Sequence, residues 1–305
     1  MHRVIRSTAT AAFIALAVQS FTVGVLAPKL PREVCRPGVS DYRNLTLPAA
    51  PMVKINNADG AVAVSTHDLA EIQVTADIRA YTQSSDMKPV AEQYLATLLK
   101  TEENAESLNI VTEPLERPDA VDLRVDYTVL VPKGTNIAVS GTTGNVRVGP
   151  GCGNVTVEGN FTDIYITEPL GDVNARSIVG RIDVVSAPGA ARLRTVNGAI
   201  VAAMRGGLLD ARTTNGNIYA TVLDPKVRSC DLTVTNGNIT LVMSEGCSAE
   251  VSATTGRGVV TSELPLEGTE GVQRRRELHG TIGQGQTKLS MSSLNGRISI
   301  TRNTT

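Results

Sequence analysis

The chain of 305 residues has no tryptophan, and only 3% of its residues are aromatic. This scarcity excludes a thick core built around large rings, and it favours short stacked strands joined by tight turns. An excess of charge is missing as well, because 29 Lys and Arg stand against 30 Asp and Glu. We therefore expect no nucleic-acid partner, since a chain without a basic surplus lacks the electrostatic attraction that such binding needs.

Metal-ligand and disulfide patterns are also lacking. The chain has three histidines and four cysteines, with no C-x-x-C spacing and no histidine at ligand spacing from Cys or Glu. We therefore predict no metal site and no cofactor. Cys230 and Cys247 lie about one repeat apart, but their strand registers differ by about two residues, which would strain a disulfide between them.

The N-terminal segment predicts export. Arg3 and Arg6 precede a mostly apolar stretch that contains several small residues. Residues 1–27 are therefore expected to be a signal peptide or an uncleaved N-terminal membrane anchor, and contact with the membrane is expected only through this segment. The Pro-punctuated residues 28–50 are interpreted as a linker.

A nine-residue period dominates the second half of the chain. Its marks are Gly144, Gly153, Thr162, Gly171, Gly180, Gly189, Gly198, Gly207 and Gly216. Two and four residues after every mark stand apolar side chains, for example Val146 and Val148 or Ile200 and Ala202. Alternation followed by a turn indicates a strand with one buried face, and repetition at a fixed period indicates a solenoid. We predict an all-β fold in which residues 141–302 form a parallel β-solenoid, with two strands in each coil of about 18 residues.

The segment 51–140 is expected to be a small β-rich cap at the N-terminal end of the solenoid. Gly60 is followed by Val62 and Val64 in the register of the later repeats. One helix is predicted at about residues 89–103, because Ser85 or Asp86 can cap it and Pro89 suits its first turn. No comparable cap is evident after the last predicted strand.

Asn-Gly pairs recur before the strands at one corner of the predicted coil. They are Asn197-Gly198, Asn215-Gly216, Asn236-Gly237 and Asn295-Gly296. Asn-Gly accepts positive φ and forms tight turns, so these pairs are structural turn residues. Stacked in register, the asparagines are expected to form a ladder of side-chain hydrogen bonds. The step from Gly216 to Gly237 is three residues longer than the others, which predicts a bulge at residues 224–230.

The order of these motifs resembles a known bacterial family. A D-G-x-V-x-V strand at residues 59–64 precedes the V-P-K-G-T turn at 131–135, the repeated N-G-x-I strands, and the G-T-I-G-x-G motif at 280–285. Over about residues 50–302 the chain is similar to the "putative adhesin" family, domain of unknown function 4097. This resemblance implies a β-solenoid in an exported or envelope protein, and it supplies no catalytic residues.

Two outward columns of side chains bear on function. We expect Arg147, Tyr165, Asp183, Val201, Tyr219 and Thr240 on one sheet, and Thr156, Asn174, Arg192, Asp210, Thr233 and Ser252 on the other. Carbohydrate cleavage needs two converging carboxylates, and neither column places two acids on adjacent coils. Arg192 and Asp210 are interpreted as a surface ion pair. The protein is therefore predicted not to be an enzyme.

Candidate binding residues are few. Tyr165 and Tyr219 could stack on sugar rings or be scattered surface tyrosines. Arg274, Arg275 and Arg276, in a long exposed loop or hairpin at about residues 262–280, could contact an acidic envelope polymer or lipid headgroups, or form a solvated loop tip.

The function expected from these observations is non-enzymatic. We expect a protein of the periplasm or cell surface, or one anchored in the membrane and facing outward. It presents a flat polar surface for binding or for a structural role at the cell envelope, with an envelope polysaccharide or another envelope protein as the expected partner. A polysaccharide-acting β-helix enzyme and an accessory domain in envelope stress signalling are the alternatives.

Overall fold

The computed structural model describes residues 38–82, 85–97, 99–104, 106–112, 121–267 and 276–303. The chain divides into two compact units, residues 1–36 and 37–305, and all described residues belong to the second. The predicted signal peptide or anchor at residues 1–27 lies outside the described residues. None of the described helices has the length and apolar character that crossing a membrane requires.

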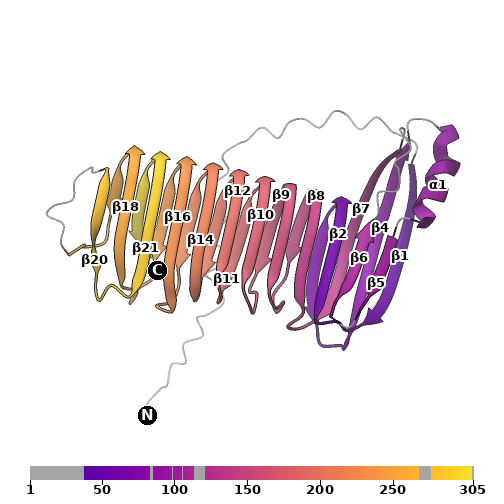
Figure 1. The fold of residues 1–305 in the computed structure, drawn as a ribbon, viewed down its shortest axis with the longest axis horizontal. Helices are drawn as coiled ribbons and strands as arrows, with labels where there is room; N and C mark the ends of the chain where they lie inside the picture. The colour runs from indigo at the N-terminus through magenta and orange to yellow at the C-terminus, as the bar shows by residue number, and fades with distance from the viewer. Residues whose placement is uncertain are drawn as a thin grey trace, which may run out of the picture. The chain divides into compact units, whose positions relative to one another are not determined.

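The fold is all-β with one short α-helix, as the sequence predicts. The first strands are β1 (Gly38–Pro48), β2 (Met52–Asp59), β3 (Val62–His67), β4 (Glu71–Thr82), β5 (Leu99–Glu103), β6 (Leu108–Thr112) and β7 (Val121–Pro132), with a 3-10 turn at Ser85–Met87 and helix α1 at Lys88–Thr97. Figure 1 shows α1 beside β4 and β1, at the end of the strand array opposite β20.

Parallel two-strand coils follow. Their strands are β8 (Asn136–Val148), β9 (Val155–Thr167), β10 (Val173–Val179), β11 (Ile182–Ala187), β12 (Ala191–Asn197), β13 (Ile200–Met204), β14 (Gly207–Asn215), β15 (Ile218–Val222), β16 (Val227–Asn236) and β17 (Ile239–Met243). The last strands are β18 (Ala249–Arg257), β19 (Val260–Ser262), β20 (Glu277–Ile282), β21 (Thr287–Asn295) and β22 (Ile298–Arg302).

The register confirms the predicted coil. β10, β12, β14 and β16 pair in parallel in one sheet, while β11, β13, β15 and β17 pair in parallel in the other. Ile182, Ile200 and Ile218 are partners in register, and each is fully buried. All the apolar positions two and four residues after the nine-residue marks are buried. The space between the sheets is therefore filled by Val, Ile, Leu and Ala, which accounts for the scarcity of aromatics.

A column of glycines lets the coils approach closely at the Asn-Gly corner. A Cβ at Gly198 would lie 1.9 Å from the carbonyl oxygen of Gly180, and a Cβ at Gly216 would lie 1.9 Å from that of Gly198. Buried hydroxyls use the same carbonyls as acceptors: Thr195 donates to Gly180 at 3.1 Å and Thr213 to Gly198 at 3.0 Å. The corner thus satisfies its buried polar groups while permitting no side chain at the glycine positions.

The N-terminal part differs from the sequence prediction in two ways. Residues 38–48, predicted as linker, form β1, which pairs antiparallel with β4 over its whole length. Its inward side is partly polar, with Asp41 and Arg43 joined by an ion pair of 2.8 Å, so the apolar alternation is interrupted. Helix α1 ends at Thr97 rather than near 103, because Leu99–Glu103 instead pair as β5 with β6.

The far end of the array is closed by a change in strand order. β21 and β22 pair with β16 and β17, and on their other sides with β18 and β19, which precede them in the chain. β20 then pairs antiparallel with β18. Contrary to the sequence expectation, the strands around Ile298 and Ile300 are thus not the edge. An antiparallel strand covers β18, which interrupts the parallel edge at this end.

Candidate binding surface

One outward column differs from the prediction in a way that changes the surface. Asn174, Arg192 and Asp210 are partners in register as expected, but the next partner of Asp210 is Asp231, not Thr233. The reason is a bulge in β16 opposite Gly207 and Leu208 within the longer coil. Two carboxylates therefore stand on adjacent coils, contrary to the expectation that none would. The sequence does contain a sign of this pairing. Asn215 and Asn236 are 21 residues apart, and the same spacing separates Asp210 from Asp231.

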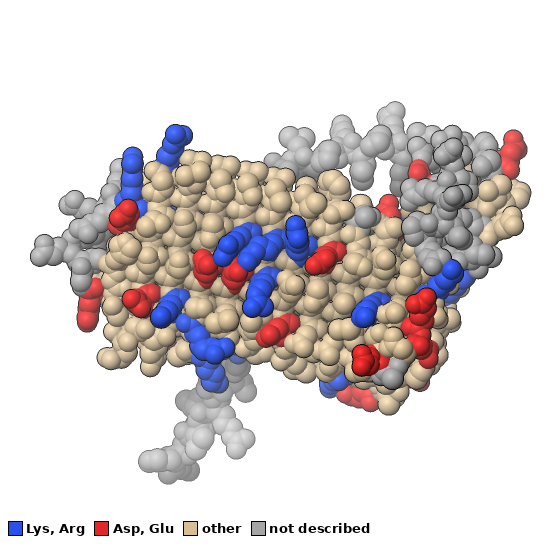
Figure 2. Space-filling view, in the orientation of Figure 1, with Lys and Arg blue, Asp and Glu red and all other residues tan. Residues whose placement is uncertain are grey.

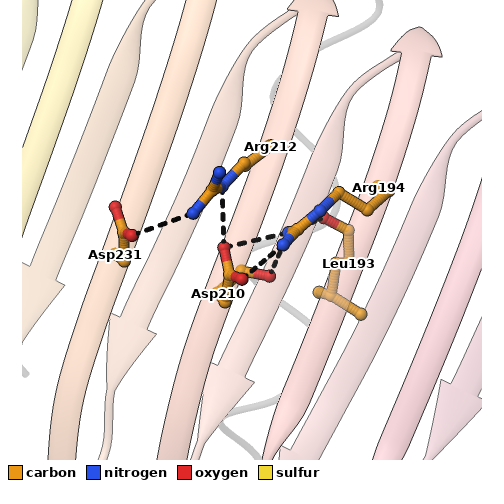
Figure 3. A network of polar contacts seen from close by, with 5 residues as sticks. All are labelled: Leu193, Arg194, Asp210, Arg212 and Asp231. Carbon is orange, nitrogen blue, oxygen red and sulfur yellow. Dashed lines mark hydrogen bonds and ion pairs between the residues drawn. The ribbon is translucent and has the colours of Figure 1, made fainter.

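The ion pair at this place also differs from the predicted one. Arg194, not Arg192, holds Asp210: its Nη1 lies 2.9 Å from Oδ1, its Nη2 contacts Oδ2, and its Nη1 also donates to the Asp210 carbonyl at 3.0 Å. Arg212 bridges the two acids, with Nε 3.1 Å from Asp210 and Nη2 3.2 Å from Asp231 (Figure 3). Each carboxylate is thus neutralised by a guanidinium, which makes the pair unsuited to acid–base chemistry.

The charge state of Asp210 follows from this network. Burial raises the pKa of its carboxyl, but the hydrogen bonds and charges of Arg194, and then of Arg212, outweigh that cost and hold the pKa below its ordinary value. A depressed folded-state pKa contributes stability above the unfolded-state value of about 4, and that stability is lost as the pH falls through the folded-state value.

Replacing Asp210 with asparagine should therefore lower the free energy of unfolding at neutral pH only. We expect a loss of no more than about 1 kcal/mol, because Arg194 and Arg212 are 35% and 50% exposed. Urea midpoints of the wild type and of Asp210→Asn should differ at pH 7 and converge as the pH falls through the lowered folded-state pKa of Asp210. Asp231→Asn removes a single exposed contact, with Arg212, and should lower the urea midpoint at pH 7 by less than Asp210→Asn does. A difference between wild type and Asp210→Asn that persists in acid would contradict this account.

Three arginines form a row across consecutive coils. Arg176, Arg194 and Arg212 are partners in register on β10, β12 and β14, and Arg192 lies two residues away from Arg194 on the same face. We call these four residues the arginine cluster. Figure 2 shows Lys and Arg side chains gathered over the middle of this sheet. Within the described part of the chain, no hydrogen bond or ion pair engages the side chains of Arg176 and Arg192, and both are exposed.

Apolar side chains line one side of the arginine cluster. Ile178 and Val196 occupy neighbouring register positions two residues beyond Arg176 and Arg194, and each is about 40% exposed. Phe161 and Val179 are exposed at the adjoining corner. A hollow of ≈ 280 Å³ adjoins this apolar row, lined by Ser140, Gly141, Glu158, Gly159, Asn160, Arg176 and Ile178. A row of apolar side chains and a row of arginines therefore lie side by side on this face.

The second sheet carries the predicted tyrosines on a less charged face. Tyr165 and Tyr219 occupy the same column but are separated by Asp183 and Val201, so the structure does not bring them together. Arg147 lies 5.5 Å from the centroid of the Tyr165 ring. β13, β15 and β17 contain no charged residue. The role of the tyrosines in sugar binding stays a prediction.

Asp183 is the carboxylate on this sheet with a perturbed environment. Burial raises its pKa, and the hydrogen bond of 2.6 Å from Arg181 offsets this only in part. A carboxyl with a raised pKa is the kind of group that a general acid requires.

The four asparagines of the Asn-Gly turns form the predicted ladder. Asn215 donates through Nδ2 to Oδ1 of Asn197, Asn236 to Asn215, and Asn295 to Asn236, each at 2.8 Å. The last step joins residues 59 apart in the chain, because β21 follows β16 in the sheet. Each of these hydrogen bonds thus joins one coil to the next along the solenoid axis.

Replacing Asn215 with alanine should cost about 1 kcal/mol of the free energy of unfolding, because two exposed hydrogen bonds are lost and water replaces them in part. Asn295→Ala removes one such bond and should cost about half as much. Thr214→Ala, which changes a neighbouring exposed residue outside the ladder, serves as the control. Equal denaturation midpoints for Asn215→Ala and Thr214→Ala would show that the ladder adds no stability.

The remaining predicted positions contribute less. Arg274 and Arg275 lie outside the described residues, and Arg276 is exposed, with its carbonyl accepting a hydrogen bond of 2.7 Å from the Thr255 amide. In the described ranges, no group of His, Cys, Asp and Glu could hold a metal ion. Cys230 is a buried free thiol, and burial raises its pKa to about 12.

Comparison with known proteins places the chain in a family. The family model described as Toastrack DUF4097 matches residues 123–301, which run from within β7 to within β22. The chain belongs to the Toastrack DUF4097 family. The match confirms the resemblance inferred from the motifs, and this family of adhesin-like proteins has a β-solenoid-like fold.

Solved structures give weaker likenesses. A putative adhesin from Bacteroides fragilis is 11% identical, with a TM-score of 0.40 over 87% of this chain and 97% of that chain. A putative adhesin from Parabacteroides distasonis is 8% identical, with a TM-score of 0.39 over 88% and 98%. A putative cell adhesion protein from Clostridium sporogenes is 11% identical, with a TM-score of 0.27 over 88% and 100%. No curated protein matches the chain. Likenesses of this size carry no information on what the chain binds.

Proposed function

We propose that the protein is an exported, non-enzymatic, adhesin-type solenoid that binds an extended envelope polysaccharide on the outer face of β10, β12 and β14. The observation that carries this proposal is the repetition of outward side chains at one strand spacing, about 4.8 Å. Ile178 and Val196 repeat beside Arg176 and Arg194 in this way. A surface that repeats suits a ligand that repeats, because successive units of a polymer can make equivalent contacts.

The exposed apolar row supports a sugar ligand in particular. Sugar rings have apolar faces and polar edges, so they suit Ile178 and Val196 with polar groups alongside. Exposed apolar groups in a contiguous patch also mark interaction sites more often than scattered ones do. Export is supported by the apolar segment after Arg3 and Arg6, and the mass of the mature N-terminus would test it.

The test of binding compares two matched apolar sites. The full chain is titrated with a panel of neutral and acidic polysaccharides and with their monosaccharides. We expect polymers to bind and monomers not to bind. Ile178→Ser together with Val196→Ser should raise the Kd by about tenfold, because two apolar contacts are lost. Leu294→Ser, which changes an exposed residue of the same column on β21, should leave the Kd unchanged.

A polysaccharide-acting enzyme is the second candidate, and the raised pKa of Asp183 is the observation that favours it. It predicts that new reducing ends appear when the protein is incubated with a polymer that it binds. Release that Asp183→Asn abolishes would replace the binding proposal with the enzymatic one. Binding of a polymer without the appearance of new reducing ends, at any protein concentration, would exclude cleavage of that polymer.

A further inference from the structure

The outer face of β10, β12 and β14 carries an uneven charge. These three strands contain the four residues of the arginine cluster and a single acid, Asp210. Arginines in register on neighbouring strands stand about 4.8 Å apart and repel one another. Such an arrangement costs stability unless partners neutralise it.

The available partners neutralise only half of the cluster. Asp210 is held by Arg194 and Arg212, and Asp231 contacts Arg212 from the other side. Arg176 and Arg192 have no such partner among the described residues. Both side chains point outward from the sheet, because their neighbours in sequence point inward. Ala175 and Ser177, on either side of Arg176, are buried, and so is Leu193, which follows Arg192.

The geometry of the free pair suits two acid groups rather than one. Arg176 and Arg192 lie on neighbouring strands and are offset by two register positions, which separates their Cα atoms by roughly 8 Å. A guanidinium offers a planar fork of donors that matches a carboxylate or a phosphate. Two such forks at a fixed separation can each hold one acid group of a ligand that carries them at intervals.

We propose that Arg176 and Arg192 are the primary contacts of a binding site for an acidic polysaccharide, one that bears carboxylate or phosphate groups along its length. The inference rests on the proposed function and names the chemistry of its ligand. The polymer lies across β10, β12 and β14, with its acid groups on Arg176 and Arg192 and its sugar faces on Ile178 and Val196. Arg194 and Arg212 are paired with Asp210 and Asp231 and are not primary contacts of the polymer.

The flanking acids favour such a polymer over a flat or uniformly charged partner. Glu158 is the register partner of Arg176 on one side, and Asp231 lies on the other side of the cluster. An anionic membrane surface would meet these carboxylates as well as the arginines, and the chain as a whole has a formal charge of −1. A ligand with spaced charges avoids this repulsion, because it presents acid groups only where guanidiniums stand.

The experiment measures Kd values of the full chain for three probes. Polygalacturonate supplies carboxylates, poly(glycerol phosphate) supplies phosphates, and fully methyl-esterified polygalacturonate is the neutral control. The double variant Arg176→Glu with Arg192→Glu should weaken binding of at least one acidic probe by about tenfold or more, and salt should weaken wild-type binding. The probe that is affected identifies the acid group.

The control is the double variant Arg257→Glu with Lys288→Glu, which changes the net charge equally on β18 and β21 of the same sheet. It should leave all three Kd values unchanged, and both variants should keep the wild-type β-sheet circular dichroism at room temperature. An equal loss with the control variant would overturn the proposal in favour of general charge attraction. Equal affinity for the acidic and neutral probes would overturn the acidic ligand while leaving the proposed function intact.

Two further results separate the alternatives. If no polysaccharide of any kind binds, both the proposed function and this inference fail. If vesicles of anionic lipid or DNA bind as tightly as the acidic probes and respond equally to Arg176→Glu with Arg192→Glu, the cluster is a general anion surface, and a polysaccharide site is excluded.

Discussion

Replacing Gly198 with alanine is expected to lower the free energy of unfolding by about 3 kcal/mol or more. The new Cβ would lie 1.9 Å from the carbonyl oxygen of Gly180, far inside van der Waals contact. The obstacle is backbone, so no side-chain rotation can relieve it, and the two coils must separate. Separation of the coils would also lengthen the backbone hydrogen bonds between neighbouring strands, which adds to the loss of stability. Chemical denaturation of the full chain measures the effect.

Gly246→Ala isolates the other cost of replacing a glycine. Gly246 has a φ of 77°, but no atom lies within 4 Å of the position that its Cβ would take. This variant therefore incurs only the left-handed backbone penalty, about 1–2 kcal/mol. If both variants shift the denaturation midpoint equally, close coil contact is not what keeps glycine at position 198.

The second large effect is expected from Ala202→Asp. Ala202 faces the space between the two sheets and is 1% exposed, so the new carboxylate would be buried without a partner. We expect a loss of about 4 kcal/mol or more, which would unfold much of the solenoid. Loss of β-sheet circular dichroism at room temperature, or a strongly lowered melting temperature, would record it.

Ala203→Asp is the matched control, because it makes the same substitution one residue further along β13. Ala203 faces outward and pairs in register with Thr221, which is uncharged. Its cost should remain within about 0.5 kcal/mol. Similar losses for the two variants would mean that the assignment of inward and outward positions in β13 is wrong.

The solenoid was predictable because its signal is local and repeated. Each nine-residue unit carries the same alternation, so Val184, Ile200 and Ala211 could be assigned to the interior one strand at a time. Asn197 and Asn215 could be aligned for the same reason, since each precedes a glycine at the same phase of the repeat. No long-range information was needed.

The rest depends on contacts that the repeat does not encode. β1 pairs with β4 through its backbone, but its inward face includes Asp41 and Arg43, and Arg43 donates to the carbonyl of Leu95 at 2.7 Å. The partner of Arg43 lies 52 residues away in the chain, so the sequence alone gives no sign that this polar segment is an ordered strand. The placement of Asp231 beside Asp210 depended on a bulge, and a shift of two residues along β16 conceals the acid pair.

The arginine cluster was not predicted either, because the repeat shows which residues are in register but not which side chains contact each other. Arg192 was matched with Asp210 from the repeat, but a side chain two residues away, Arg194, is the one that reaches this carboxylate. Arginine has a long side chain, so its partner is decided by reach and rotamer rather than by register. Which guanidiniums remain free is therefore visible only in the structure.

The position of β21 and β22 between earlier strands has a consequence for how the molecule assembles. A solenoid that adds coils in chain order can grow on its free edge as synthesis proceeds. Here β18 and β19 have no permanent neighbour in the parallel array until β21 and β22 have been made, because these later strands separate them from β16 and β17. Assembly thus departs from the order of synthesis in its last steps, and the outermost coil docks only when the segment that follows it has already taken its place.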